Sequence, residues 1–190
     1  MSDVKNREAW LTDVAHAVEP LFDGFAVAPY RVTCGWPASG GLTGRVLGEC
    51  HGVKSSAGGV HELFISPRLD KPLEVAGVLV HEMAHVVAGV DARHGAGFLR
   101  ICGHVGLTKG KPRSRMPGTA LDAHLSKIIE AHGVYPHQSL KPAVKVVARR
   151  LSQVKLVCVC GCTCRMSAKW LEEAGFPTCG CGGEMGMASE

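Results

Sequence analysis

The chain has 190 residues, of which 46% are hydrophobic and 20% are charged, with a mild formal net charge of +4. This length suits one ordinary domain with a small appendage and excludes a large multidomain enzyme, and the composition excludes a disordered chain. The charged N-terminal segment lacks the apolar core of a secretory signal, and no window reaches the roughly 18–20 apolar residues that cross a bilayer. We therefore expect a cytoplasmic protein with no membrane partner.

The first third of the chain predicts one helix followed by a strand-rich region. Apolar residues recur at helical spacing from Glu8 to about Leu21, where Pro20 ends the pattern. Residues 24–59 are dense in Gly and Pro and predict short strands joined by turns. The stretch "VHELFISPRL" at 60–69 alternates apolar and polar residues and predicts a strand that stops at Pro67.

Three further helices are predicted in the middle of the chain. The first covers about eighteen residues from Pro72, a residue that is favoured in a first helical turn. The second covers Ala96–Val105, and the third covers Thr119–His132 with one apolar face. The turn-rich segment "GVYPHQSLKPAVK" follows and predicts the exit from a first domain.

Composition then changes sharply, and this change sets the predicted domain boundaries. We expect a first domain at 1–140, a basic linker or helix at 141–155 and a cysteine module at 156–190. The linker and the run "KGKPRSR" at 109–115 contain basic residues and no acid. Such runs are usually solvated faces, and a salt-sensitive contact with nucleic acid is the functional alternative.

The segment "HEMAH" lies inside the first of the three helices. His81 and His85 are four residues apart, so both imidazoles project from one helix face and can bind the same metal ion. Glu82 follows the first histidine and can reach water at that metal without binding it. This is the H-E-x-x-H arrangement of zinc metalloproteases. The alternative is a pair of hydrogen-bonded core histidines.

Two residues compete for the place of the third metal ligand. His94 lies in "ARHGAGF", after an expected helix break at Gly89, where the chain can turn back toward the first two histidines. Asp91 has the spacing of the third ligand in a longer metalloprotease pattern, but that pattern needs Gly where this chain has Ala88. We favour His94 as the third ligand. For Asp91, the favoured role other than ligation is to orient a ligating imidazole.

This set of residues predicts a hydrolytic zinc site. Three protein ligands leave one zinc position for water, whose pKa the metal lowers to about 7, and Glu82 can take the proton as the water attacks a carbonyl carbon. A peptide bond is the natural substrate. The predicted strand "HELFISP" at 61–67 is expected to hold an extended peptide by edge pairing.

Six of the nine cysteines crowd into the segment from Cys158 to Cys181. In a cytoplasmic protein such clustering indicates metal binding rather than disulfides, and a structural zinc needs four thiolates. The halves share the phrases "CVCG" and "CGCG", and "RMSAKWLEEAGFPT" supplies the loop between them. Matching register selects Cys158, Cys160, Cys179 and Cys181 as ligands of one structural zinc ion. Cys162 or Cys164 is the alternative in the first pair, because the usual spacing is C-x-x-C.

"HEMAH", "HGAGF" and the terminal cysteine cluster resemble the SprT-like zinc metalloproteases. The phrases "CGWP", "FISPRL", "VGL" and "YPHQSL" resemble the short variants of actinobacteria and their phages. The resemblance implies an α+β, minigluzincin-like fold with a zinc ribbon. It also implies catalytic zinc on His81, His85 and His94 with Glu82 as general base. Family relatives cut proteins crosslinked to DNA, which implies protein substrates and a DNA partner.

Two functions therefore compete. The first is a zinc metalloendopeptidase that acts on proteins, including DNA-bound ones. The second is a non-catalytic nucleic-acid-associated protein in which the cysteine module and basic residues such as Lys141, Arg149 and Arg150 bind DNA. A zinc hydrolase that does not act on peptides is a third possibility, for which no residue argues.

Overall fold

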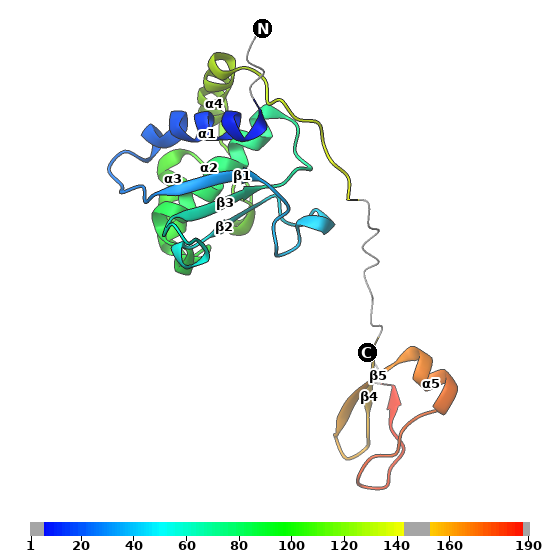
Figure 1. Cartoon of the computed structure of the whole chain (residues 1–190). Helices are drawn as coiled ribbons and strands as arrows, with labels where there is room; N and C mark the ends of the chain where they lie inside the picture. Colours follow the sequence, from blue (N-terminus) through cyan, green and yellow to red (C-terminus); the bar gives the residue numbers. More distant parts are fainter. Residues whose placement is uncertain (1–5, 143–152, 188–190) are drawn as a thin grey trace. The chain divides into compact units, whose positions relative to one another are not determined.

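A three-stranded sheet forms one layer of the first part of the chain (Figure 1). The structure, a computed structural model, describes residues 6–142 and 153–187. The strands are β1 (Tyr30–Cys34), β2 (Gly48–His51) and β3 (His61–Ile65), in the order β1-β3-β2. The central strand β3 runs parallel to β1 and antiparallel to β2. The sequence prediction that β3 offers a free edge to a peptide is therefore wrong, and the edge strands are β1 and β2.

The central strand has one buried face, as its alternating sequence predicts. His61, Leu63 and Ile65 are buried, whereas the residues between them are half-buried. The parallel register places Val32 beside Leu63 and Cys34 beside Ile65, so buried side chains of both strands share one face of the sheet. This face packs on helices.

Four helices complete the first part of the chain. They are α1 (Arg7–Val18), α2 (Pro72–Ala88), α3 (Ala96–Val105) and α4 (Thr119–His132). Helices α1 and α2 contact the sheet, and α3 and α4 pack on α2. The short 3-10 turns are Glu19–Phe22, Gly41–Thr43, Val53–Ser55, Val90–Ala92 and Pro112–Ser114. Predicted bounds agree for α3 and α4, whereas α1 ends three residues early because the turn containing Pro20 follows it.

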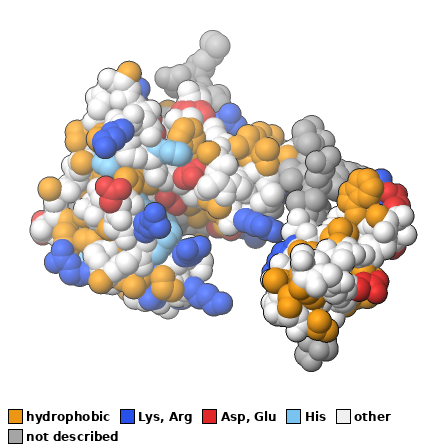
Figure 2. Space-filling model, turned by 90° about the horizontal axis from the view of Figure 1, so that it is seen from below, with side chains coloured by type: hydrophobic (Ala, Val, Ile, Leu, Met, Phe, Trp, Pro, Cys, Tyr) orange, Lys and Arg blue, Asp and Glu red, His pale blue; other side chains and the backbone are white. Residues whose placement is uncertain are grey.

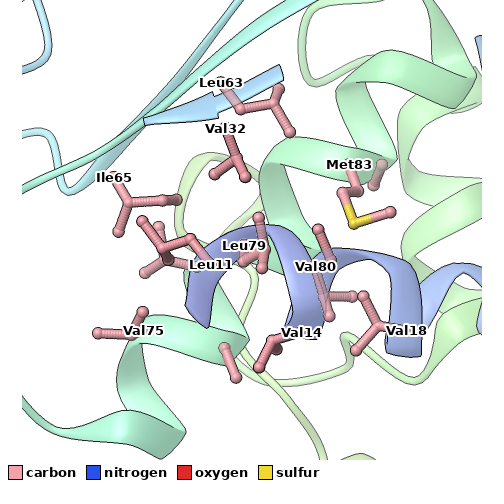
Figure 3. Close-up of a cluster of buried hydrophobic side chains, with 14 of the residues drawn as sticks. Leu11, Val14, Val18, Val32, Leu63, Ile65, Val75, Leu79, Val80 and Met83 are labelled. Atoms are coloured by element: carbon pink, nitrogen blue, oxygen red, sulfur yellow. The ribbon is translucent and has the colours of Figure 1, made fainter. Parts of the chain in front are cut away.

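Helix α2 is the centre of the core. Every residue from Val75 to Val86 is buried, because the sheet, α1, α3 and α4 surround the helix. Figure 3 shows Leu11 and Val14 of α1 near Leu79 and Val80 of α2, beneath strand residues such as Val32. Burying one such aliphatic side chain contributes about 1.5–3 kcal/mol, so the position of α2 is firmly fixed.

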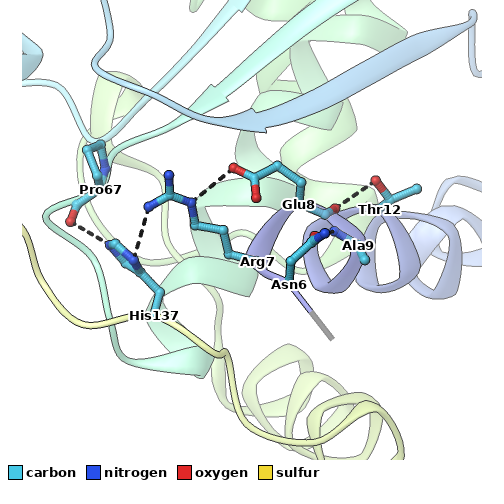
Figure 4. A network of polar contacts seen from close by, with 7 residues as sticks. All are labelled: Asn6, Arg7, Glu8, Ala9, Thr12, Pro67 and His137. Carbon is cyan, nitrogen blue, oxygen red and sulfur yellow. Dashed lines mark hydrogen bonds and ion pairs between the residues drawn. The ribbon is translucent and has the colours of Figure 1, made fainter. Parts of the chain in front are cut away.

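The segment after α4 returns to α1 (Figure 4). Trp10 Nε1 donates to the carbonyl oxygen of Gly133 at 2.8 Å. His137 Nε2 donates to the carbonyl oxygen of Pro67 at 2.9 Å, which leaves Nδ1 to accept from Arg7 Nη1 at 3.3 Å. The predicted domain exit is thus a strap that binds the start of α1 to the loop after β3.

The cysteine region forms a second small sheet with the order β5-β4-β6. Its elements are β4 (Gln153–Val157), β5 (Thr163–Ser167), α5 (Ala168–Ala174) and β6 (Gly186–Met187). Helix α5 lies where the sequence predicts a loop, and the Ser167 hydroxyl caps it by accepting from the Trp170 amide. Among the described residues of this region, the buried hydrophobic core is Leu156, Cys158 and Met185, which is too small to hold such a fold without a metal or other crosslink.

The chain divides into two units, Met1–Lys145 and Val146–Glu190, and both helices and strands occur in each. The overall class is therefore α+β, as expected. Most of the predicted basic linker at 141–155, including Arg149 and Arg150, lies outside the described residues. Among the helices of the described ranges, none has the length and apolar character needed to span a membrane.

Candidate metal centres

Helix α2 and the turn after it assemble the histidines. His81, Glu82 and His85 are buried on α2, which ends at Ala88 and is followed by the capping residue Gly89. Gly89 has a positive φ of 78°, a conformation that glycine adopts without strain. The chain then reverses through the turn Val90–Ala92, and His94 precedes α3. This reversal brings His94 back beside α2.

The three imidazoles form a compact group. One ring nitrogen from each of His81, His85 and His94 lies within 4.8 Å of the other two. Nε2 of His85 and Nε2 of His94 are 3.3 Å apart. Two nitrogens on a tetrahedral zinc, each about 2.0–2.1 Å from the ion, lie about 3.3 Å apart. Asp91, the rival in the sequence, is exposed and does not belong to this group.

The backbone of a neighbouring loop fixes the orientation of His81. The carbonyl oxygen of Arg115 lies 3.0 Å from His81 Nδ1. A carbonyl oxygen can only accept, so Nδ1 carries the proton and Nε2 keeps its lone pair. Metal-ligating histidines commonly donate their second ring N–H in this way.

Phe98 of α3 supports all three rings. Its side chain is fully buried and stacks on His85, with ring centroids 4.1 Å apart and planes 19° apart. The centroids of His81 and His94 each lie 5.0 Å from that of Phe98. The phenyl ring therefore limits how far each imidazole can rotate away from the common point.

The electrostatics of the site keep the imidazoles neutral. Burial and, to a lesser extent, the neighbouring histidines His81 and His94 lower the pKa of His85 to about 3. Burial also lowers the pKa of His81 and of His94. Neutral imidazoles retain the lone pairs that bind a cation, so the donor set fits Zn²⁺.

Glu82 is a buried residue of α2, and its side chain faces β2. Burial and, to a lesser extent, the nearby charge of Glu49 raise the pKa of its carboxyl group to about 8. Strand β2 reaches Glu82 only because residue 48 is Gly. A Cβ at Gly48 would lie 2.6 Å from Glu82 Oε1 and 2.6 Å from Val78 Cγ1.

The second centre is formed by the four cysteines that the repeated phrase selects. One sulfur from each of Cys158, Cys160, Cys179 and Cys181 lies within 4.8 Å of the others. The Cys158–Cys181 and Cys160–Cys179 sulfur pairs are 3.4 and 3.6 Å apart. Tetrahedral zinc with Zn–S bonds of about 2.3 Å separates sulfurs by about 3.8 Å, so small movements suffice to bind the ion.

The two phrases fold into the same turn. In the first, the Gly161 amide donates to the Cys158 carbonyl at 2.8 Å, and in the second the Gly182 amide donates to the Cys179 carbonyl at 2.8 Å. Both glycines have φ near +85°. The hydrogen bond from the Cys162 amide, together with hydrogen bonds from the neighbouring thiols, lowers the pKa of Cys160 to about 6, so a thiolate forms readily.

The two remaining clustered cysteines are placed differently. Cys162 is exposed, and Cys164 packs toward Met185 with its sulfur 3.6 Å from Sδ. Neither belongs to the group of four sulfurs. The structure therefore brings together the four cysteines that the sequence analysis selected first, and it leaves the alternatives Cys162 and Cys164 outside the group.

Sequence reasoning did not identify three contributors to the histidine centre. These are the Phe98 platform, the Arg115 carbonyl and Gly48. A backbone carbonyl leaves no mark in a sequence, and the close approach of β2 depends on strand pairing.

Searches of protein-family models, curated proteins and solved structures found no match for the chain.

Proposed function

We propose that this protein is a zinc metalloendopeptidase of the SprT-like type. The observation that carries the proposal is the convergence of three neutral imidazoles on one point, with Glu82 on the same helix as two of them. A purely structural metal site would have four protein ligands, whereas a hydrolytic site has three and leaves a position open. The histidine group has three members among the described residues.

In this proposal His81, His85 and His94 bind the ion, and the Arg115 carbonyl and Phe98 hold them in place. Zinc bound there would supply Lewis acidity toward a water molecule and a peptide carbonyl. Glu82 does the proton transfer. Its carboxylate accepts a proton from the attacking water and returns it to the leaving amine.

Strand β2 is the part of the sheet best placed to hold the substrate. It is an edge strand that pairs only with β3 among the described residues, and Gly48 on it lies against Glu82. An extended polypeptide added to this edge has its backbone fixed by hydrogen bonds beside the carboxylate. Such binding contacts the substrate backbone rather than particular side chains, so it suits unfolded protein segments of many sequences.

The decisive experiment compares zinc-loaded wild type with Glu82→Gln on an unfolded protein such as casein. We expect the variant to keep bound zinc and to lose nearly all turnover, because the amide cannot take a proton. Glu130→Gln, the same change at an exposed position of α4, is the matched control and should retain activity. Turnover by Glu82→Gln at the wild-type rate would contradict the proposal.

Nucleic-acid binding by the cysteine unit is the second candidate. Lys155 of β4 and Arg165 of β5 are direct cross-strand partners, and both are exposed. Like charges in this arrangement repel, so a bound anion would stabilise them. Lys155→Glu should then weaken the binding of a single-stranded oligonucleotide, and wild-type affinity should fall steeply with salt. The absence of wild-type binding at low salt would exclude this function.

A further inference from the structure

A short basic loop borders the histidine centre. We define the basic loop as Thr108–Met116, which contains four Lys or Arg residues and no acid. Lys109 and Met116 close it through two backbone hydrogen bonds of 3.1 and 2.9 Å. Inside it, the Ser114 amide donates to the Lys111 carbonyl at 2.9 Å, and Gly110 has φ of 83°. The loop is thus a closed, internally hydrogen-bonded structure.

Two contacts fix this loop beside the site. The hydrogen bond between His81 Nδ1 and the Arg115 carbonyl joins the end of the loop to the first histidine. The ion pair between Lys109 Nζ and Asp122 of α4, at 3.0 Å, anchors its start. The loop therefore cannot move away from the metal centre without breaking the contact that orients His81.

Three cations of the loop have no carboxylate partner among the described residues. Lys109 is paired with Asp122, whereas Lys111, Arg113 and Arg115 form no ion pair in the described ranges. Arg113 is exposed and lies two residues before Arg115, whose carbonyl oxygen is 3.0 Å from His81 Nδ1. Figure 2 shows a face on which Lys and Arg side chains lie near exposed histidine side chains.

We propose that the basic loop selects polypeptides that carry an acidic side chain close to the bond that is cut. The inference rests on the proposed peptidase function and names its preferred substrates. A carboxylate beside the histidine centre gains attraction from Lys111 and Arg113, whereas a lysine there is repelled. An acidic polypeptide is favoured over nucleic acid because the loop is attached to His81, where a phosphate backbone would occupy the place of the peptide bond.

The test uses the zinc-loaded full chain and three unstructured, internally quenched peptides. They share one length and a Gly, Ala and Ser background, with Glu, Gln or Lys at the same alternating positions. The kcat/KM of each peptide is measured for wild type, Arg113→Glu and Lys127→Glu. Lys127 is an exposed residue of α4, so its variant makes the same change in net charge outside the loop.

We expect wild type to have a higher kcat/KM for the Glu peptide than for the Lys peptide. Arg113→Glu should lower the ratio of these two kcat/KM values by about tenfold. Lys127→Glu should keep the wild-type ratio. Raising the salt concentration should shrink the wild-type preference, because the Debye length falls below about 10 Å above 0.1 M.

Three results would overturn the inference, and they differ in whether they also contradict the proposed peptidase function. Equal cleavage of all peptides by wild type removes the preference and leaves the peptidase function intact. No cleavage of any peptide or of casein removes both. Binding of a fluorescent single-stranded oligonucleotide that Arg113→Glu abolishes, with no peptide preference, would make the loop a nucleic-acid contact instead.

Discussion

Phe98 stacks on His85 with only 4.1 Å between ring centroids, and it also contacts the other two histidines of the centre. We predict that Phe98→Leu keeps the fold but weakens zinc binding about tenfold, because the smaller, non-planar side chain lets the imidazoles rotate. Competition with a chromophoric chelator at neutral pH measures the affinity.

Phe22→Leu is the control for that substitution. Phe22 is equally buried in the same core and makes no ring contact with the three histidines in the described structure. It should lower stability to a similar extent and leave zinc affinity unchanged. Equal zinc affinity in both variants would show that the stack with His85 has no part in holding the metal ligands.

The approach of β2 to α2 leads to a second prediction. Gly48→Ala should destabilise the protein by about 1–3 kcal/mol and reduce turnover, because the new methyl group collides with Val78 and Glu82. Gly103→Ala on α3 meets no atom within 4 Å and should stabilise by up to about 1 kcal/mol. Urea unfolding and casein cleavage measure both effects. A fully active, stable Gly48→Ala would mean that β2 and Glu82 do not approach so closely.

The helices of the first unit were predictable because their determinants are local. Pro72 begins α2, Gly89 ends it, and the apolar spacing of α4 gives both of its ends correctly. The group of three histidines follows from the same local signals, since a helix places His81 and His85 together and a break at Gly89 returns His94.

Strand order was not predictable from local signals. The alternation in β3 shows that one face is buried, but it does not show how many neighbours the strand has. Here β1 pairs with it in parallel and β2 in antiparallel fashion, so the free edges of the described sheet belong to β1 and β2 and not to β3. Pairing between distant segments depends on the packing of α1 and α2 against the sheet, which no short window of sequence contains.

Buried ionisable groups lead to a prediction about pH. The pKa of Glu82 in the metal-free folded state is about 8, above its ordinary 4.5, so the folded state binds this proton more tightly than the unfolded chain does. Stability from this group is full below pH 4.5 and is lost as pH rises through 8. The histidines have lowered pKa values, so their effect is confined to pH below about 6.5, where stability falls with falling pH.

Between pH 6.5 and 8 the Glu82 effect therefore acts without the histidines. In excess chelator, the free energy of unfolding of wild type should fall across this window by on the order of 2 kcal/mol, and that of Glu82→Gln should not. Urea titrations at the two pH values measure the difference, and the cysteine unit contributes equally to both proteins. Parallel pH dependence in the two proteins would contradict a buried, protonated Glu82.

The last prediction separates the cysteines that bind metal from those that do not. Replacing Cys158, Cys160, Cys179 or Cys181 by Ser should lower the zinc content from about two ions per chain to about one. Cys162→Ser should keep both ions, because Cys162 is exposed and lies outside the group of four sulfurs. Zinc content is measured by elemental analysis of purified protein.

The same variants report on folding. Because Leu156, Cys158 and Met185 are the only hydrophobic side chains in the buried core of its described residues, we expect the cysteine unit to need a bound metal ion for stability. Loss of the ion should therefore expose β4, β5 and α5 to proteolysis while the first unit stays resistant and, if it is a peptidase, active. Equal protease resistance of Cys160→Ser and Cys162→Ser would mean that the four-sulfur group does not stabilise the unit, since only the first of these variants removes a member of it.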